Sequence, residues 1–153
     1  MALECFVKKG GKYLMLRRSE SKKILPGVLL APGGKREFNE GLFECARREI
    51  LEETGLEIKN IKIKVAGNGY LKDVDQEVFF HFLVADYASG ELHQDPDDGE
   101  LLWMTEDEIV ADKDVLAEIP HVAKYIFDDL DKCVSYTVVY ERGNEMSELV
   151  MEE

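Results

Sequence analysis

The sequence predicts a fold of the α/β (α+β) class, in which a mixed β-sheet packs between helices. Segments with the two-residue alternation of strands are separated by two principal segments with helical periodicity. Hydrophobic residues make up 45% of the 153 residues, which is enough for one real core and argues against a disordered chain. Because this length fits one domain, we expect residues 1–153 to form a single domain.

Eight segments have the alternation or the short apolar run that is typical of a β-strand. In chain order they are residues 3–8, 13–17, 27–31, 58–65, 77–85, 101–104, 133–141 and 146–150. The Gly10-Gly11 pair predicts a hairpin turn between the first two strands. A second turn around Gly143-Asn144 predicts a closing hairpin. An acidic loop over residues 87–100 separates the fifth strand from the sixth.

Two long helices and one short helix are expected between these strands. Residues 40–54 predict the first, with Asn39 as the N-cap and Gly55 as the C-terminal stop. Residues 105–108 read Thr-x-x-Glu, a capping box that opens a short helix. Residues 120–132 predict the second long helix. The apolar positions at helical spacing near it are Ile119, Val122, Ile126 and Leu130.

Charge and composition exclude several classes of function. The formal net charge is −13, with 15 basic and 12 acidic residues in residues 1–85 but 4 basic and 20 acidic residues in residues 86–153. So acidic a surface argues against duplex nucleic acid or an anionic membrane as a partner, whereas a small phosphorylated ligand remains compatible with the basic residues of the first half. No apolar run approaches the roughly 18 residues of a transmembrane helix.

Cysteine usage and the start of the chain predict a cytoplasmic protein. The three cysteines are far apart in the sequence and none belongs to a Cys-x-x-Cys pair, so reduced thiols are expected. The first apolar run contains Glu4 and is followed by Lys8 and Lys9, which is the wrong order for a secretory signal.

The predicted first helix places three carboxylates on one face, because Glu49, Glu52 and Glu53 stand at i, i+3 and i+4. These like charges repel one another, and they lie in the last turns before Gly55, at the negative end of the helix dipole. A divalent cation such as Mg²⁺, which prefers oxygen ligands, would offset both the repulsion between the glutamates and their unfavourable interaction with the helix dipole. Local rules that are broken together are expected at functional sites.

The alternative is a solvated acidic face on which Arg47 and Arg48 act as counter-charges. A longer pattern, which includes residues on both sides of these glutamates, decides against this alternative. A chance match to it would occur at about one in 10⁹ positions or fewer. The pattern is Gly34, five residues, Glu40, seven residues, then Arg48-Glu49-Ile50-x-Glu52-Glu53-x-Gly55-Leu56. It matches the Nudix box at every fixed position, so the chain resembles the Nudix (MutT-like) hydrolase family. The resemblance implies a Nudix-like α/β/α sandwich.

The resemblance also implies a reaction: members hydrolyse a nucleoside diphosphate linked to a further group, by attack of water at phosphorus with Mg²⁺ or Mn²⁺. The positions that match the family's metal ligands are the Gly33 carbonyl, Glu40, Glu49, Glu52 and Glu53. Glu53 or Glu52 is expected to deprotonate or orient the attacking water as well. Arg48 falls where an arginine braces the metal-binding glutamates.

Further site residues are expected outside the box. Family members often bring one more acid from the region before a strand like 101–104. The candidates in this loop are Asp95, Asp97, Asp98 and Glu100; Glu100 is our choice, with Asp97 second. Basic residues bracket the Pro32-Gly33-Gly34 turn, where phosphate capture is expected of a few. For substrate binding we single out Arg18, Lys23 and Lys35, together with Trp103 as a residue that could stack on a base.

The favoured activity is hydrolysis of a nucleoside triphosphate to the monophosphate and pyrophosphate, in a monomer or homodimer that binds a small nucleotide. The alternatives are a Nudix-fold module that binds a nucleotide without turnover, and a diphosphatase for coenzyme A or another nucleotide conjugate. Residues 115–118 do not show the Trp and Asp pair with which the enzymes that sanitise oxidised purine nucleotides read the base. Three intact glutamates favour the enzyme over the binding module.

Overall fold

The computed structural model describes residues 1–152 and contains one large mixed sheet with few helices. The strands are β1 (Ala2–Lys9), β2 (Lys12–Arg18), β3 (Leu29–Leu30), β4 (Gly33–Lys35), β5 (Glu57–Leu71), β6 (Gln76–Ser89), β7 (Gly99–Met104), β8 (Val134–Arg142) and β9 (Glu145–Met151). The helices are α1 (Leu42–Thr54), the 3₁₀ turn η1 (Lys72–Val74), α2 (Glu106–Ala111) and α3 (Ile119–Ile126). No helix in this described part is long and apolar enough to cross a membrane.

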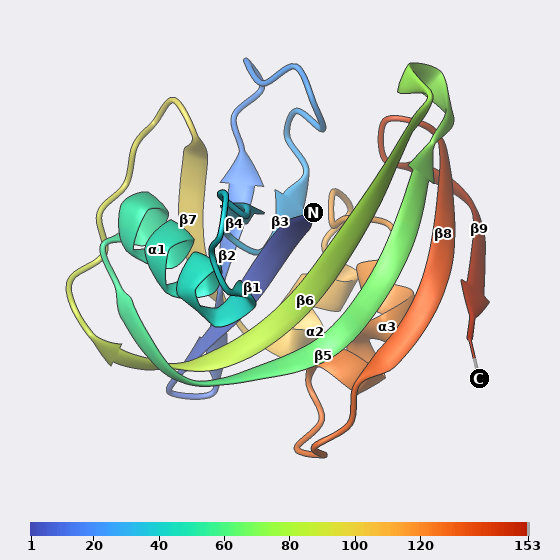
Figure 1. Cartoon of the computed structure of the whole chain (residues 1–153). Coiled ribbons are helices and arrows are strands. Elements are labelled where there is room, and N and C mark those ends of the chain that lie inside the picture. The colour runs from blue at the N-terminus through green and yellow to red at the C-terminus, as the bar shows by residue number, and fades with distance from the viewer. Residues whose placement is uncertain (153) are drawn as a thin grey trace.

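The strands follow the order β3-β2-β1-β6-β5-β8-β9, with β4 paired to β1 and β7 paired to β2. The pairs β1–β6 and β5–β8 are parallel and the other pairs are antiparallel. In Figure 1, β6, β5 and β8 form a long curved surface, with α1 in front of the other end of the sheet and α2 and α3 behind it. A mixed sheet between helices confirms the predicted fold class.

The alternation along β1 distributes its side chains between two cores. Leu3, Cys5 and Val7 are buried in the core beneath α1, together with Cys45 and Ile50 of that helix. Burial of one such aliphatic side chain contributes about 1.5–3 kcal/mol, so this face fixes α1 against the sheet.

The opposite face of the sheet packs on α2 and α3 through aromatic residues. Phe6 of β1 contacts Phe82 and Phe127 edge-on, at centroid distances of 5.7 and 5.5 Å. Ile119 and Val122 of α3 complete this second core. The two cores hold the carboxyl end of α1 and the segment before α3 at fixed positions relative to the first residues of β1.

The two long helices differ from their predicted bounds. α1 begins at Leu42 with Gly41 as N-cap, while the expected cap Asn39 adopts a left-handed conformation (φ 58°) in the preceding loop. α3 ends at Ile126 instead of residue 132, and Leu130 is exposed. In the turn after α3, the carbonyl groups of Asp128 and Leu130 accept hydrogen bonds from Lys64.

β5 and β6 are longer than the apolar pattern predicted, running to Leu71 and Ser89. The two strands are antiparallel partners, from Glu57 opposite Ser89 to Leu71 opposite Gln76, and η1 joins them. Main-chain hydrogen bonds therefore extend both strands beyond their apolar residues. The acidic loop is correspondingly shorter than expected and begins at Gly90.

Lys64 offers a test of this packing, because its ammonium group is buried yet fully paired. It donates to Oδ1 and the carbonyl of Asp128 at 2.7 and 3.2 Å and to the carbonyl of Leu130. We expect Lys64→Ala to lower the free energy of unfolding by about 2 kcal/mol or more in urea titrations, because it removes a buried side chain together with the three hydrogen bonds of its ammonium group. The matched control is Lys62→Ala, which breaks an exposed pair with Asp131 and should cost less than about 1 kcal/mol. Equal small losses in both variants would contradict the structural role of Lys64.

Candidate active site

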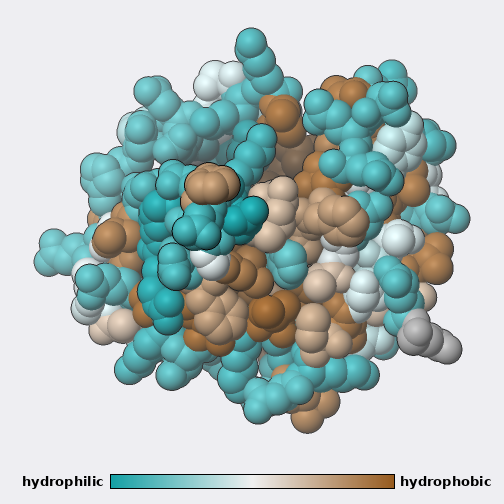
Figure 2. All heavy atoms as spheres, in the orientation of Figure 1, coloured by the Kyte–Doolittle hydropathy of each residue, from teal (hydrophilic) through white to brown (hydrophobic). Residues whose placement is uncertain are grey.

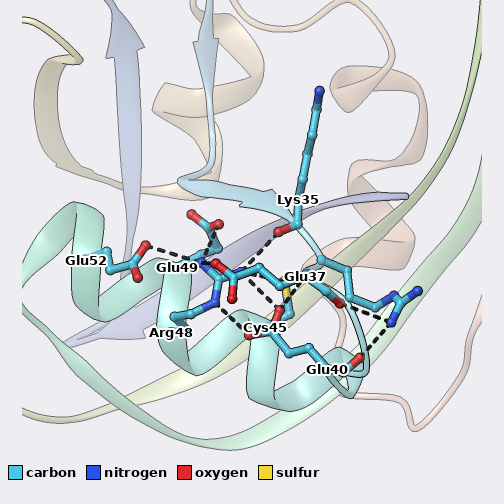
Figure 3. A network of polar contacts seen from close by, with 8 residues as sticks. Lys35, Glu37, Glu40, Cys45, Arg48, Glu49 and Glu52 are labelled. Carbon is cyan, nitrogen blue, oxygen red and sulfur yellow. Dashed lines mark hydrogen bonds and ion pairs between the residues drawn. The ribbon is translucent and has the colours of Figure 1, made fainter.

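Arg48 is the centre of a network that ties α1 to the loop before it (Figure 3). Its Nε and Nη2 bind the two carboxylate oxygens of Glu40 at 2.6 and 3.0 Å, a bidentate pair. Its Nη1 donates to Glu49 at 2.9 Å and to Glu52 at 3.2 Å, and Nη2 also donates to the Lys35 carbonyl at 3.0 Å. The guanidinium lowers the pKa of Glu40 to about 2. One side chain therefore orients three predicted site acids.

The β4 backbone lies against α1 because two glycines allow a close approach. A Cβ at Gly34 would overlap the carboxyl group of Glu49, and a Cβ at Gly33 would overlap the Leu3 carbonyl of β1. The Gly33 N–H donates to a carboxyl oxygen of Glu53 at 3.1 Å. The predicted box residues are thus brought together at the point where β4 crosses the C-terminal half of α1.

Glu53 is the least compensated acid of this cluster. Its pKa is raised to about 7, mainly by burial and also by the charges of Glu49 and Asp98, while the Gly33 N–H and the charge of Arg18 oppose this rise. A carboxyl in this position repels its acidic neighbours whenever it is ionised. The site therefore holds carboxylates that repel one another, and a bound cation would reduce this repulsion.

The donor set fits a hard divalent cation, since Glu49, Glu53 and Asp98 present carboxylate oxygens near one another. Within residues 1–152 no three acidic, histidine or cysteine side chains are already gathered at metal-binding spacing. Glu49 is held by Arg48 and Glu53 by a backbone N–H, so binding would exchange these partners for a cation. Glu52 is more than half exposed and lies on the outer side of the cluster.

The acidic loop brings Asp98, and not Glu100, to the cluster. Asp98 accepts a hydrogen bond from Lys22 at 3.1 Å and its charge acts on Glu53. Glu100 is exposed and pairs with Arg17 across β7 and β2, on the face of the sheet opposite α1.

Strand alternation explains the position of Glu100. Leu101 packs in the core beneath α1, whereas Leu102 packs in the core of α3. Glu100 therefore shares a face with Leu102 and points away from α1. Asp98 is among the acids that the sequence offers in the 95–100 loop, but its contact with Lys22 joins two loops distant in sequence, so no local pattern singles it out.

The four predicted substrate-binding residues have different environments. Arg18 lies close enough to Glu53 to lower its pKa, and its Nε binds the Ile24 carbonyl at 2.9 Å. Lys23 is exposed, and in Figure 3 the Lys35 side chain points away from the Arg48 network.

Trp103 does not reach the cluster. It packs in the core beneath α1 and lies near Lys9, at 5.9 Å from the ammonium to the ring centroid. Lys9 is the last residue of β1, whereas Gly33 pairs near its first residues. The packing of β7 thus holds Trp103 near the end of β1 opposite to Gly33, and base stacking by Trp103 stays a prediction.

Two further acids at this end of the sheet carry no sequence signal. Glu4 accepts a hydrogen bond from the Ala31 N–H at 3.0 Å, and burial together with the charge of Glu118 raises its pKa to about 8. Glu118 is buried and accepts hydrogen bonds from the hydroxyl groups of Tyr136 and Tyr140. Burial raises the pKa of Glu118 to about 7.

Fold and site together define an acidic centre, in which helix carboxylates lie beside a glycine strand. Residues 2–145 match the family model of the NUDIX domain, and the chain belongs to this family. It is 37% identical over 103 residues to the uncharacterized Nudix hydrolase YfcD of Escherichia coli (strain K12), covering 66% of this chain and 56% of that protein.

The chain is also similar to a second sequence relative and to a solved structure. A stretch of 56 residues is 43% identical to the m7GpppN-mRNA hydrolase NUDT17 of Xenopus laevis, covering 37% of this chain and 19% of that protein. The crystal structure of a MutT protein from Bacillus halodurans superposes with a TM-score of 0.83 at 24% identity, covering 99% of this chain and 96% of that one. The chain thus spans little more than half of the YfcD relative and a fifth of NUDT17.

The raised pKa of Glu4 makes stability depend on pH. Between about pH 4.5 and 8 the unfolded state loses a proton that the folded state keeps, so this group lowers stability as pH rises through that window. We expect Glu4→Gln to have the stability of the parent near pH 4.5 and to exceed it by a few kcal/mol at pH 8, from about 1.4 kcal/mol per pKa unit. Urea titrations at both pH values measure the difference. The exposed Glu148→Gln should show no such trend, and a pH-independent difference for Glu4→Gln would refute the buried-acid account.

Proposed function

We propose that the protein is a Mg²⁺-dependent diphosphohydrolase that cleaves a nucleoside triphosphate to the monophosphate and pyrophosphate. The observation that carries this proposal is the cluster in which Arg48 orients Glu49 and Glu52 while Glu53 remains partly buried and repelled by its acidic neighbours. Membership of the NUDIX family supports hydrolysis of a nucleotide-linked diphosphate. The presence of all three helix glutamates favours an enzyme over a module that only binds nucleotides.

Glu49, Glu53 and Asp98, with Glu52 at the rim, would hold Mg²⁺ or Mn²⁺. Such a cation neutralises charge on the diphosphate and lowers the pKa of bound water. Glu53 is suited to take the proton of the attacking water, because its pKa near 7 makes both protonation states accessible at neutral pH. The oxygen of that water forms a bond to phosphorus as the bridging P–O bond breaks, and pyrophosphate leaves.

The basic residues opposite this cluster would orient the phosphate chain. Arg18 is close to Glu53, and Lys22 is held beside it through Asp98. Arg18 is the last residue of β2 and Lys22 lies in the loop that follows it, so both cations would contact the diphosphate from this end of β2. Lys23, which extends from the same loop, is available for the outer phosphate.

The proposal places one catalytic domain in the cytoplasm and holds for a monomer or a homodimer. Cys5 and Cys45 are buried free thiols, and Cys133 is an exposed one, which supports a reducing compartment.

We expect Glu53→Gln to lower turnover by about 10²-fold or more, the lower end for loss of a general base. The variant should be at least as stable as the parent in EDTA, because it removes a partly buried charge without changing shape. Pyrophosphate release over a panel of nucleotides, with and without Mg²⁺, measures the activity. Glu44→Gln is the control on the same helix, since Glu44 is exposed in its first turn.

Full activity in Glu53→Gln would remove Glu53 from the mechanism. Absence of Mg²⁺-dependent pyrophosphate release by the parent on every nucleotide of the panel would overturn the proposed reaction itself.

A further inference from the structure

Thr54 follows Glu53 in the chain and carries a hydroxyl group in the last turn of α1. Hydrophilic side chains cover much of the surface over α1 (Figure 2), whereas the Thr54 side chain is fully buried. Its hydroxyl donates to the Ile50 carbonyl at 2.6 Å and accepts from the Leu56 N–H at 3.1 Å. This one group therefore links the last turn of the helix to the residues that lead into β5.

The end of α1 does not need the Thr54 hydroxyl as a cap, because Gly55 already supplies one. Gly55 adopts a left-handed conformation (φ 79°), and its N–H donates to the Leu51 carbonyl at 3.0 Å, which is a common way for a helix to end. Within a helix, a threonine hydroxyl bonded to the carbonyl four residues earlier slightly destabilises the helix and often bends it. Such a cost without a capping benefit indicates that the hydroxyl serves the placement of neighbouring groups.

The backbone of Thr54 also holds the acidic loop. Its carbonyl accepts a hydrogen bond from the His93 N–H at 2.7 Å. A Cβ at Gly55 would lie 2.6 Å from the Glu91 carbonyl oxygen, and a Cβ at Gly90 would lie 2.5 Å from the Gly55 carbonyl oxygen. Two glycines therefore allow the backbone of the loop to lie directly against the end of α1.

The segment that leads from this junction to Asp98 is tied to itself and to β7. The Asp98 N–H donates to the Asp95 carbonyl at 3.0 Å, and Oε1 of Gln94 accepts from the Leu101 N–H at 3.2 Å. The position of Asp98 thus depends on both ends of the loop, on β7 at one end and on the end of α1 at the other.

The junction at Thr54 lies between two acids that repel each other. Glu53 precedes Thr54 by one peptide bond, and Asp98 follows the anchored residue His93 by five residues. The charge of Asp98 raises the pKa of Glu53, so the two carboxyl groups are close enough to interact. A rotation of the last helical turn, or a shift of the loop, would change the direction of Glu53 and its separation from Asp98.

We propose that Thr54 is a positioning residue of the cation site: its hydroxyl fixes the last turn of α1 so that Glu53 and Asp98 can share one divalent cation. This inference rests on the proposed function, because it concerns the cation of the same site. Thr54 contacts neither the cation nor the substrate, since its buried hydroxyl makes both of its hydrogen bonds within the protein.

The test compares the affinity for Mn²⁺, measured by calorimetric titration, in the parent, Thr54→Val and Thr54→Ser. Valine has the shape of threonine without the hydroxyl, so the Kd for Mn²⁺ should rise about 10-fold or more, as expected when a group that orients metal ligands is removed. Serine keeps the hydroxyl and should restore most of the affinity. Pyrophosphate release by the same proteins is measured in parallel.

Thr105→Val is the matched control, because Thr105 also binds the backbone through its hydroxyl, as the N-cap of α2 on the other side of the sheet. Loss of this cap should lower the melting temperature and leave the affinity for Mn²⁺ unchanged. A general loss of stability is thereby separated from a loss of positioning. Melting temperatures in EDTA show which variants are folded, and Thr54→Ala, titrated at a lower temperature, replaces the valine variant if that one is unfolded.

Equal affinity for Mn²⁺ in the parent and in the folded valine or alanine variant overturns the inference. A serine variant that binds as weakly as the valine variant overturns it as well, and so does a parent that binds no Mn²⁺. If affinity depends on the Thr54 hydroxyl but the parent releases no pyrophosphate from any nucleotide, the proposed function fails and the positioning role stands.

Discussion

The Arg48 guanidinium is the interaction on which the rest of the site depends. It binds carboxylates from the loop before α1 and from α1 itself, and it binds the Lys35 carbonyl of β4. Without it, Glu40, Glu49 and Glu52 would repel one another and α1 would lose its connection to the glycine strand. Because the same cation fixes both helix and strand, the position of Glu53 beside Gly33 follows from it.

Around this centre the fold places several acidic side chains where their ionisation lowers the stability of the folded state. Burial raises the pKa values of Glu4, Glu53 and Glu118 to between about 7 and 8, so none of them stabilises the fold as an isolated charge. Glu4 and Glu53 accept hydrogen bonds from the N–H groups of Ala31 and Gly33, which are two residues apart along the chain.

The sequence predicted what is encoded locally and missed what depends on packing. The carboxylate face of α1 and its end at Gly55 follow from spacing within one helix, and both are found. The loop before α1 was misjudged, because Asn39 adopts a left-handed conformation that no pattern demanded. The acidic 95–100 loop is recognisable in the sequence, but the choice of Asp98 within it depends on a contact with the distant Lys22. The proximity of Glu4 to Glu118 likewise depends on how distant segments pack, so no local pattern indicates it.

The central claim is that Arg48 orients carboxylates that bind a divalent cation, and Mn²⁺ affinity measured by calorimetric titration tests it most directly. The account predicts that the parent binds Mn²⁺ and that Arg48→Ala, still folded in EDTA, binds it about 10–100-fold more weakly, as expected when a residue that orients metal ligands is removed. Equal affinity in the two proteins, or no binding by the parent, would contradict it.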